Sequence, residues 1–150
     1  GLVAADLLVP MLGLYPLQPV RMEMHPTPAV AYLQANGRAS GGERAWAQLL
    51  AQGPPTAVFC YNDMTAIGLI DAAHGAGLAL PADLAVVGFD DVVFARFCRP
   101  PLTTVAQPVA PMGRAAMDLM GALLAEGGPG ELPGPNLALR GQLIVRASSG

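Results

Sequence analysis

Short apolar runs that end abruptly in polar residues dominate the pattern of this chain. One run extends from Thr56 to Tyr61 and another from Leu84 to Phe89, and neither alternates between apolar and polar positions. Uninterrupted runs of this length are typical of strands buried in a parallel sheet. The stretch between them, from Met64 to Gly75, has the apolar spacing of a helix. The order strand, helix, strand predicts a right-handed βαβ unit.

The rest of the chain gives further expected elements of both kinds. Apolar content predicts a helix over Leu2 to Leu14 that Pro10 kinks or ends, and apolar spacing predicts helices from Ser40 or Gly41 to Gly53 and over Val109 to Ala125. The other expected segments are a strand at Val20 to Met24, a loop at His25 to Asn36, an extended segment at Pro100 to Val105, a turn-rich linker at Gly127 to Pro135 and a last strand at Gln142 to Arg146.

Each of the two buried runs is followed by a polar pair. Asn62-Asp63 follows the first run, and Asp90-Asp91 follows the second. The carboxyl edge of an open α/β sheet is where ligands bind, and an amide beside a carboxylate suits the hydroxyl groups of sugars or nucleosides. Alternatively, Asn62 caps the helix that follows it. For Asp91 we favour capping over ligand contact.

The composition is unusually apolar for a soluble protein. Hydrophobic residues make up 53% of the chain and charged residues 13%, and the mean hydropathy is +0.44. A membrane span does not explain this, because Gly53-Pro54-Pro55 breaks the longest uncharged run. An uncovered interface is the better explanation. With a net charge of −3 and its arginines scattered, the chain alone is a poor nucleic-acid binder.

The residues that could carry covalent or metal chemistry are few. Cys60 and Cys98 lack a CxxC partner and are expected to be buried free thiols, and His25 and His74 lack metal-ligand spacing. No paired nucleophile and base and no nucleotide-binding glycine motif are present in the sequence. We therefore predict that the chain is not an enzyme and that it has no catalytic residue, no metal and no cofactor. Its N-terminus lacks a secretion signal, which favours a cytoplasmic location. It also favours the interpretation that the chain is a piece of a longer protein.

Four ordered motifs resemble the LacI/GalR family of bacterial transcriptional regulators. They are Asn62-Asp-Met-Thr-Ala-Ile-Gly68, Gly77-Leu-Ala-Leu-Pro-Ala-Asp-Leu-Ala-Val-Val-Gly-Phe-Asp-Asp91, Arg99-Pro-Pro-Leu-Thr-Thr-Val105 and Leu143-Ile-Val-Arg-Ala-Ser-Ser149. The resemblance covers about residues 53–150. It implies an α/β fold, a parallel-sheet, three-layer Rossmann-like lobe of a type I periplasmic-binding-protein-like fold, in which two lobes close around a small molecule.

The resemblance also implies roles for particular residues. Asn62 and Asp90 match the family's ligand-binding positions at the cleft. The family often has a ligand-stacking aromatic residue where this chain has Ala39, and its cleft arginine has no counterpart here. The outer face of the lobe would form a homodimer through Ile67, Phe97 and Cys98.

The resemblance further implies an incomplete domain. Residues from about 1–105 and 136–150 would form the C-terminal lobe, whereas the helix at about 108–126 would belong to the otherwise absent first lobe. Its apolar face is then expected to pack against another copy or to be displaced. The helix-turn-helix is absent as well, so operator DNA would be bound only by a longer parent protein.

The expected function is that of a small-molecule effector-sensing domain of a bacterial transcriptional repressor or regulator. The effector would be a sugar or a nucleoside-like compound, and no membrane is involved. The alternative is a solute-binding protein of a sugar transport system, which has the same fold. Upstream sequence separates the two, because a repressor has a helix-turn-helix there and a transport protein has a secretion signal.

Overall fold

The computed structural model describes residues 2–5, 31–125 and 138–150. The strand predicted at Val20 to Met24 and the linker predicted at Gly127 to Pro135 lie outside these residues. The described elements, in chain order, are β1 (Leu2–Ala5), β2 (Ala31–Leu33), α1 (Ala39–Gln52), β3 (Ala57–Cys60), α2 (Asp63–Gly75), β4 (Ala85–Asp90), the 3-10 helix η1 (Val93–Arg96), β5 (Thr103–Ala106), α3 (Val109–Ala125) and β6 (Gln142–Ile144).

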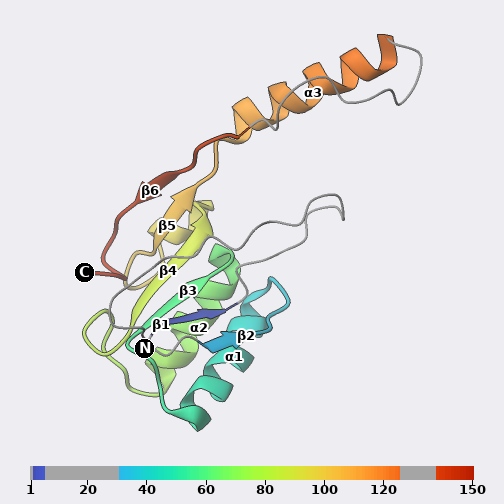
Figure 1. Cartoon of the computed structure of the whole chain (residues 1–150). Helices are drawn as coiled ribbons and strands as arrows, with labels where there is room; N and C mark the ends of the chain where they lie inside the picture. Colours follow the sequence, from blue (N-terminus) through green and yellow to red (C-terminus); the bar gives the residue numbers. More distant parts are fainter. Residues whose placement is uncertain (1, 6–30, 126–137) are drawn as a thin grey trace, which may run out of the picture.

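The strands form one sheet in the order β2-β1-β3-β4-β5-β6 (Figure 1). All neighbouring pairs are parallel except β5 and β6, which are antiparallel. The predicted βαβ unit is confirmed, because β3 and β4 are parallel neighbours joined by α2. The strand order reverses between β1 and β3. Such a switch point is where open α/β sheets form a crevice at the carboxyl ends of their strands.

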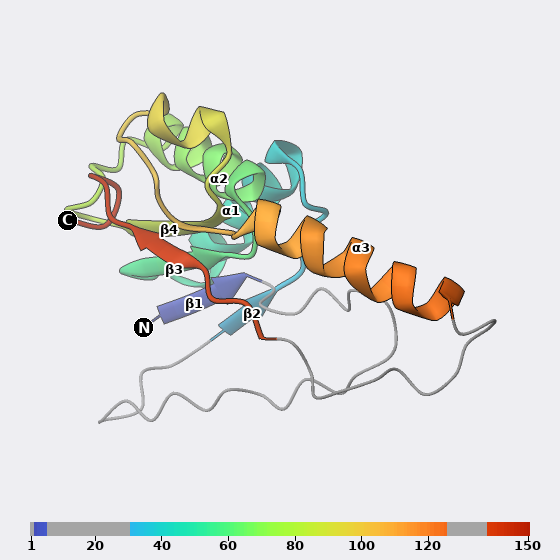
Figure 2. The ribbon, with the colours of Figure 1, turned by 90° about the horizontal axis from the view of Figure 1, so that it is seen from above.

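Helices α1 and α2 lie on one side of the sheet (Figure 2). The strand residues Val58, Cys60 and Val86 are buried, and Leu49 of α1 and Leu69 of α2 belong to the same core. The α/β class with a parallel sheet is therefore confirmed. In the described part of the chain, α1 and α2 supply one helix layer over this sheet.

Two glycines allow α1 and α2 to approach each other closely. A Cβ atom on Gly42 of α1 would lie 2.6 Å from the backbone nitrogen of Leu69, and one on Gly68 of α2 would lie 2.6 Å from the Cα of Ala39. Real Cβ atoms essentially never come this near to other backbone atoms. The helix pair is thus joined through backbone contact at both glycines.

Helix α3 has the predicted bounds and leaves the rest of the lobe. None of its residues is buried, and Figures 1 and 2 show it extending away from the sheet. Several of its apolar side chains are exposed, namely Val109, Met112, Met117, Leu119, Met120 and Leu124. No helix in the described ranges is long and apolar enough to cross a membrane.

Four expected boundaries or elements differ from the structure. Leu2–Ala5 is a strand instead of the start of a helix, because it pairs on both sides with β2 and β3. The edge strand Ala31–Leu33 lies inside the expected loop, because it pairs in parallel with β1. Helix α1 begins at Ala39, one residue before Ser40. Strand β6 ends at Ile144, and Arg146 bonds to Thr103 and Leu102 outside the ladder.

Candidate ligand-binding site

The predicted site residues Asn62 and Asp90 lie at the same edge of the sheet. Phe59 of β3 pairs with Val87 of β4, and the two polar residues follow these at equivalent positions. Asn62 is the residue before α2, and Asp90 is the last residue of β4. The expectation that both strands end at one edge is confirmed. This edge is also next to the switch point between β1 and β3.

Asn62 is the N-cap of α2, as the alternative interpretation expected. Its Oδ1 accepts a hydrogen bond from the Thr65 backbone nitrogen at 2.9 Å, and its Nδ2 donates to the Gly37 carbonyl at 3.0 Å. The bond to Gly37 joins the β2–α1 loop to the end of β3. An amide can make four hydrogen bonds, so one N–H and one oxygen lone pair of Asn62 are left for a ligand.

Asp90 combines an unusual backbone conformation with a directed side chain. Its φ is +117°, a region that residues other than glycine rarely adopt. Gln107, just after β5, donates from Nε2 to Asp90 Oδ1. Burial raises the pKa of the Asp90 carboxyl, and the hydrogen bond from Gln107 opposes this. The second carboxylate oxygen, Oδ2, is left as an acceptor.

Asp91 is an ion-pair partner and the prediction that it caps a helix is wrong. The N-cap of η1 is Val92, with no side-chain capping bond. Arg146 Nη2 lies 2.6 Å from Asp91 Oδ1, and both side chains are mostly buried. A hydrogen bond between two charged groups is stronger than a capping bond to a neutral backbone N–H, which accounts for the arginine as partner.

Asp63 is a central residue that the sequence analysis did not single out. Its side chain is fully buried, accepts a hydrogen bond from the Val92 backbone nitrogen at 2.8 Å, and accepts another from Thr104 Oγ1 at 2.5 Å. Burial raises its pKa, the two hydrogen bonds oppose this, and the nearby charges of Asp90 and Asp91 add to the rise. Its place in the first turn of α2 is visible in the sequence, whereas its distant partners are not.

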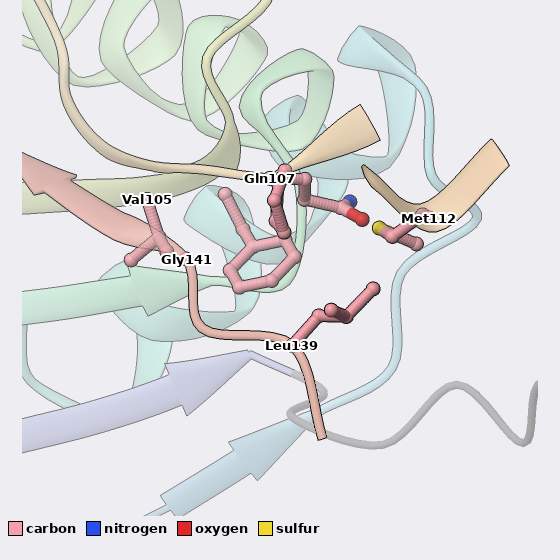
Figure 3. Close-up of a pocket in the computed structure, with 7 residues that line it drawn as sticks. Val105, Gln107, Met112, Leu139 and Gly141 are labelled. Carbon is pink, nitrogen blue, oxygen red and sulfur yellow. The ribbon is translucent and has the colours of Figure 1, made fainter. Parts of the chain in front are cut away.

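A hollow of about 460 Å³ lies beside this edge (Figure 3). Its lining is mostly apolar, with Gln107 as the polar side chain: Phe89, Val105, Gln107, Pro108, Met112, Leu139 and Gly141. Gln107 thus both lines the hollow and binds Asp90. Neither Asn62 nor Asp90 lines it.

The three residues predicted for a homodimer interface differ in exposure. Phe97 is 71% exposed, whereas Ile67 and Cys98 are partly buried and packed against the core. The Cys98 thiol donates to the Ala95 carbonyl at 3.1 Å and the Pro100 carbonyl at 3.3 Å. Val93 and Phe94 of η1, which the sequence analysis did not select, are also exposed.

The two cysteines are both free thiols. Cys60 is buried, as predicted, and burial raises its pKa to about 12. Cys98 is only half-buried, and partial burial raises its pKa as well. Both thiols are therefore poorly nucleophilic. The described residues contain no group of three histidine, cysteine or acidic side chains placed to hold a metal ion.

Comparison with known proteins gives a family and several relatives. The sequence pattern of the periplasmic binding protein-like domain matches residues 11–149. The chain is 49% identical over 80 residues to the HTH-type transcriptional repressor CytR of Escherichia coli K12, covering 53% of this chain and 24% of that protein. It is 43% identical over 109 residues to the HTH-type transcriptional regulator MalR of Streptomyces coelicolor, covering 73% of this chain and 30% of that protein. The chain thus spans only about a quarter to a third of these relatives.

Solved structures with the same fold include regulators with bound sugars. The CelR–cellobiose complex matches with a TM-score of 0.71 and 30% identity, over 80% of this chain and 36% of that one. A LacI family transcriptional regulator from Arthrobacter sp. FB24 in complex with lactose matches with a TM-score of 0.70 and 28% identity, over 81% of this chain and 45% of that one. With its sheet order, its motifs and these relatives, the chain belongs to the periplasmic binding protein-like domain family, in the LacI/GalR branch.

Proposed function

We propose that this chain is the C-terminal lobe of a small-molecule effector-sensing domain in a bacterial transcriptional regulator. The observation that carries the proposal is the placement of Asp90 and Asn62 together at the carboxyl edge beside the switch point. The Asp90 carboxylate is oriented by Gln107, and the Asn62 amide still has hydrogen-bonding capacity. The CelR and Arthrobacter structures contain cellobiose and lactose, and they support a sugar-like effector for this fold.

The effector class that fits this edge is a sugar or a nucleoside-like compound. Asp90 Oδ2 accepts from a hydroxyl group of the ligand, while the remaining N–H of Asn62 donates to a ligand oxygen. A hydrogen bond to an ionised group is stronger than one between neutral groups. Asp90 therefore supplies most of the polar affinity, and Asn62 selects orientation.

The regulatory step follows from differential affinity. A ligand that binds the closed pair of lobes more tightly than the open pair shifts the protein toward closure. Helix α3 packs on the first lobe in the full-length protein. Closure therefore moves α3 and the first lobe relative to the rest of this chain. Operator DNA is bound through a helix-turn-helix outside this chain, in the cytoplasm. The relatives named as HTH-type regulators favour this role over that of a transport solute-binding protein.

Calorimetry on the full-length protein tests the site. Lactose, cellobiose, cytidine and adenosine serve as probes, and at least one is expected to bind. Asp90→Ala should weaken that binding at least tenfold. Asn62→Ser should weaken it while keeping a capping oxygen, which separates ligand contact from the loss of a cap.

Asp71→Asn is the matched control for this experiment, because Asp71 is an exposed acid on α2. It should leave the affinity unchanged. The proposed site is wrong if Asp90→Ala and Asn62→Ser both bind the ligand as tightly as the wild type.

We also propose that the face around η1 forms a homodimer. Phe94 and Phe97 are 62% and 71% exposed, and exposed aromatic side chains of this kind mark protein interfaces. Sedimentation of the full-length protein should show a dimer that Phe97→Asp dissociates. A dimer that withstands Phe97→Asp would place the interface elsewhere.

A further inference from the structure

Gln107 connects the proposed ligand-binding carboxylate to the next strand of the sheet. Asp90 at the end of β4 pairs in register with Ala106 at the end of β5, and Gln107 is the residue that follows. Its Nε2 donates to Asp90 Oδ1. The side chain is partly buried, so water competes only weakly for this bond.

We infer that Gln107 is a positioning residue that aims the Asp90 carboxylate at the effector. The inference rests on the proposed function and adds a specific residue to it. One oxygen of Asp90 is held by the amide, which fixes the rotation of the carboxylate about its last bond. The other oxygen therefore has a fixed orientation before the ligand binds. Groups that are pre-organised in this way bind a ligand at a lower entropic cost.

The surroundings make this amide hard to replace. The charged groups near Asp90 are Asp63 on α2 and Asp91 on its own chain segment, and Arg146 is committed to Asp91. No cation in the described residues is bonded to Asp90, so Gln107 is the donor that favours its ionised form. Without that donor, burial acts on Asp90 unopposed.

The backbone of Asp90 gives a second reason for a tether. With a φ of +117°, the residue occupies a conformation that costs free energy and persists only where surrounding contacts hold it. The hydrogen bond from Gln107 is such a contact. Loss of this hydrogen bond would free the rotation of the Asp90 side chain and remove part of the restraint on its backbone.

The test uses Gln107→Leu in the full-length protein, with Gln142→Leu as the matched control. Gln142 is also a glutamine at this edge, because it pairs with Ala106, but it is exposed and has no bond to Asp90. Carbon-13 NMR of the aspartate carboxyls measures the Asp90 pKa without any ligand. Calorimetry with lactose and with cellobiose at several pH values measures affinity.

In Gln107→Leu, the Asp90 pKa should rise further, because the lost bond favoured the ionised form. The affinity for the bound disaccharide should fall about tenfold near pH 5 and recover part of this loss at pH 8. A merely structural role would lower affinity equally at all pH values. Gln142→Leu should change neither quantity.

Two results overturn the inference and leave the proposed function intact. One is an unchanged Asp90 pKa in Gln107→Leu. The other is an unchanged affinity for a disaccharide whose binding Asp90→Ala weakens. By contrast, if neither disaccharide nor either nucleoside binds to the wild type, or if Asp90→Ala leaves their affinity unchanged, it is the proposed function that fails.

Discussion

Arg146 and Asp91 join the C-terminal segment to the end of β4, with Arg146 Nη2 2.6 Å from Asp91 Oδ1. The same guanidinium donates from Nη1 to the Leu102 carbonyl at 2.8 Å. One side chain therefore ties together residues from three parts of the chain. It also fixes the segment in which Asp90 lies.

Replacing Arg146 by methionine should destabilise the lobe. The change removes both hydrogen bonds and leaves Asp91 as a mostly buried, unpaired carboxylate, which costs about 2–4 kcal/mol. Urea unfolding measures the loss. Arg140→Met is the control, because Arg140 is exposed and its replacement should change the free energy of unfolding by less than about 0.5 kcal/mol. Equal losses in the two variants would mean that the ion pair contributes nothing.

Asp63→Asn should make stability less dependent on pH. Burial raises the Asp63 pKa above the ordinary value of 3.8, so folding favours the protonated acid. Its contribution to stability is greatest below pH 3.8 and is lost as pH rises through the raised pKa. Asparagine does not titrate, and its amide can still accept from Val92 and donate to Thr104.

Unfolding by urea from pH 3 to pH 7 checks this expectation. The fall in stability with rising pH should be smaller in Asp63→Asn than in the wild type. Asp63→Ala is the contrasting variant, because it leaves both buried partners without a hydrogen bond. It should lower the free energy of unfolding by about 2–4 kcal/mol over the whole pH range. A pH profile of Asp63→Asn that coincides with the wild-type profile would contradict the assigned shift.

Gly68→Ala should separate α1 from α2. A Cβ there meets the backbone of Ala39, which cannot move aside as a side chain can, so the change should cost about 1–3 kcal/mol. Gly75→Ala provides the comparison, because a Cβ at Gly75 meets nothing within 4 Å. It should stabilise the protein by about 0.4–1 kcal/mol. Thermal unfolding of the two variants should therefore shift in opposite directions.

The exposed face of α3 should be dispensable for the stability of the isolated chain. Met117 and Leu124 are 71% and 74% exposed, so lysine at either position should change the free energy of unfolding by less than about 0.5 kcal/mol. Leu69→Ala in the core, by contrast, should cost about 2–5 kcal/mol.

A fluorescent hydrophobic dye gives a second measurement on this face. The isolated chain should bind the dye or self-associate, and Met117→Lys should reduce both effects. Light scattering reports the association. A monodisperse monomer that binds no dye would show that this face is covered in some other way.

The elements with strong local patterns could be predicted from the sequence. Helix α3 has the expected bounds, because its apolar spacing continues over its whole length. Strands β3 and β4 are apolar runs with sharp polar ends. The apolar content of Leu2–Ala5 predicts a helix, but so short an apolar stretch has no period that separates helix from strand. Pairing with two neighbouring strands decides its conformation.

The site was predictable only in part, because its bonds cross large distances in the sequence. The placement of Asn62 and Asp90 at one edge follows from strand order, which the motifs indicate. The partners of Asp63 and Asp91 are Thr104, Val92 and Arg146, and nothing local to either acid points to them. Long-range hydrogen bonds of this kind appear only once the strands are placed side by side.

The bonds of Ser148 have a consequence for how the protein is made on the ribosome. Ser148 Oγ donates to the Val86 carbonyl at 2.6 Å and accepts from the Thr103 nitrogen at 2.8 Å, although α3 lies between these partners in the chain. A nascent chain that has emerged as far as α3 still has open bonding positions in the middle of its sheet. Since domains generally fold as units during synthesis, we expect this lobe to reach its native form only after residue 148 has been synthesised.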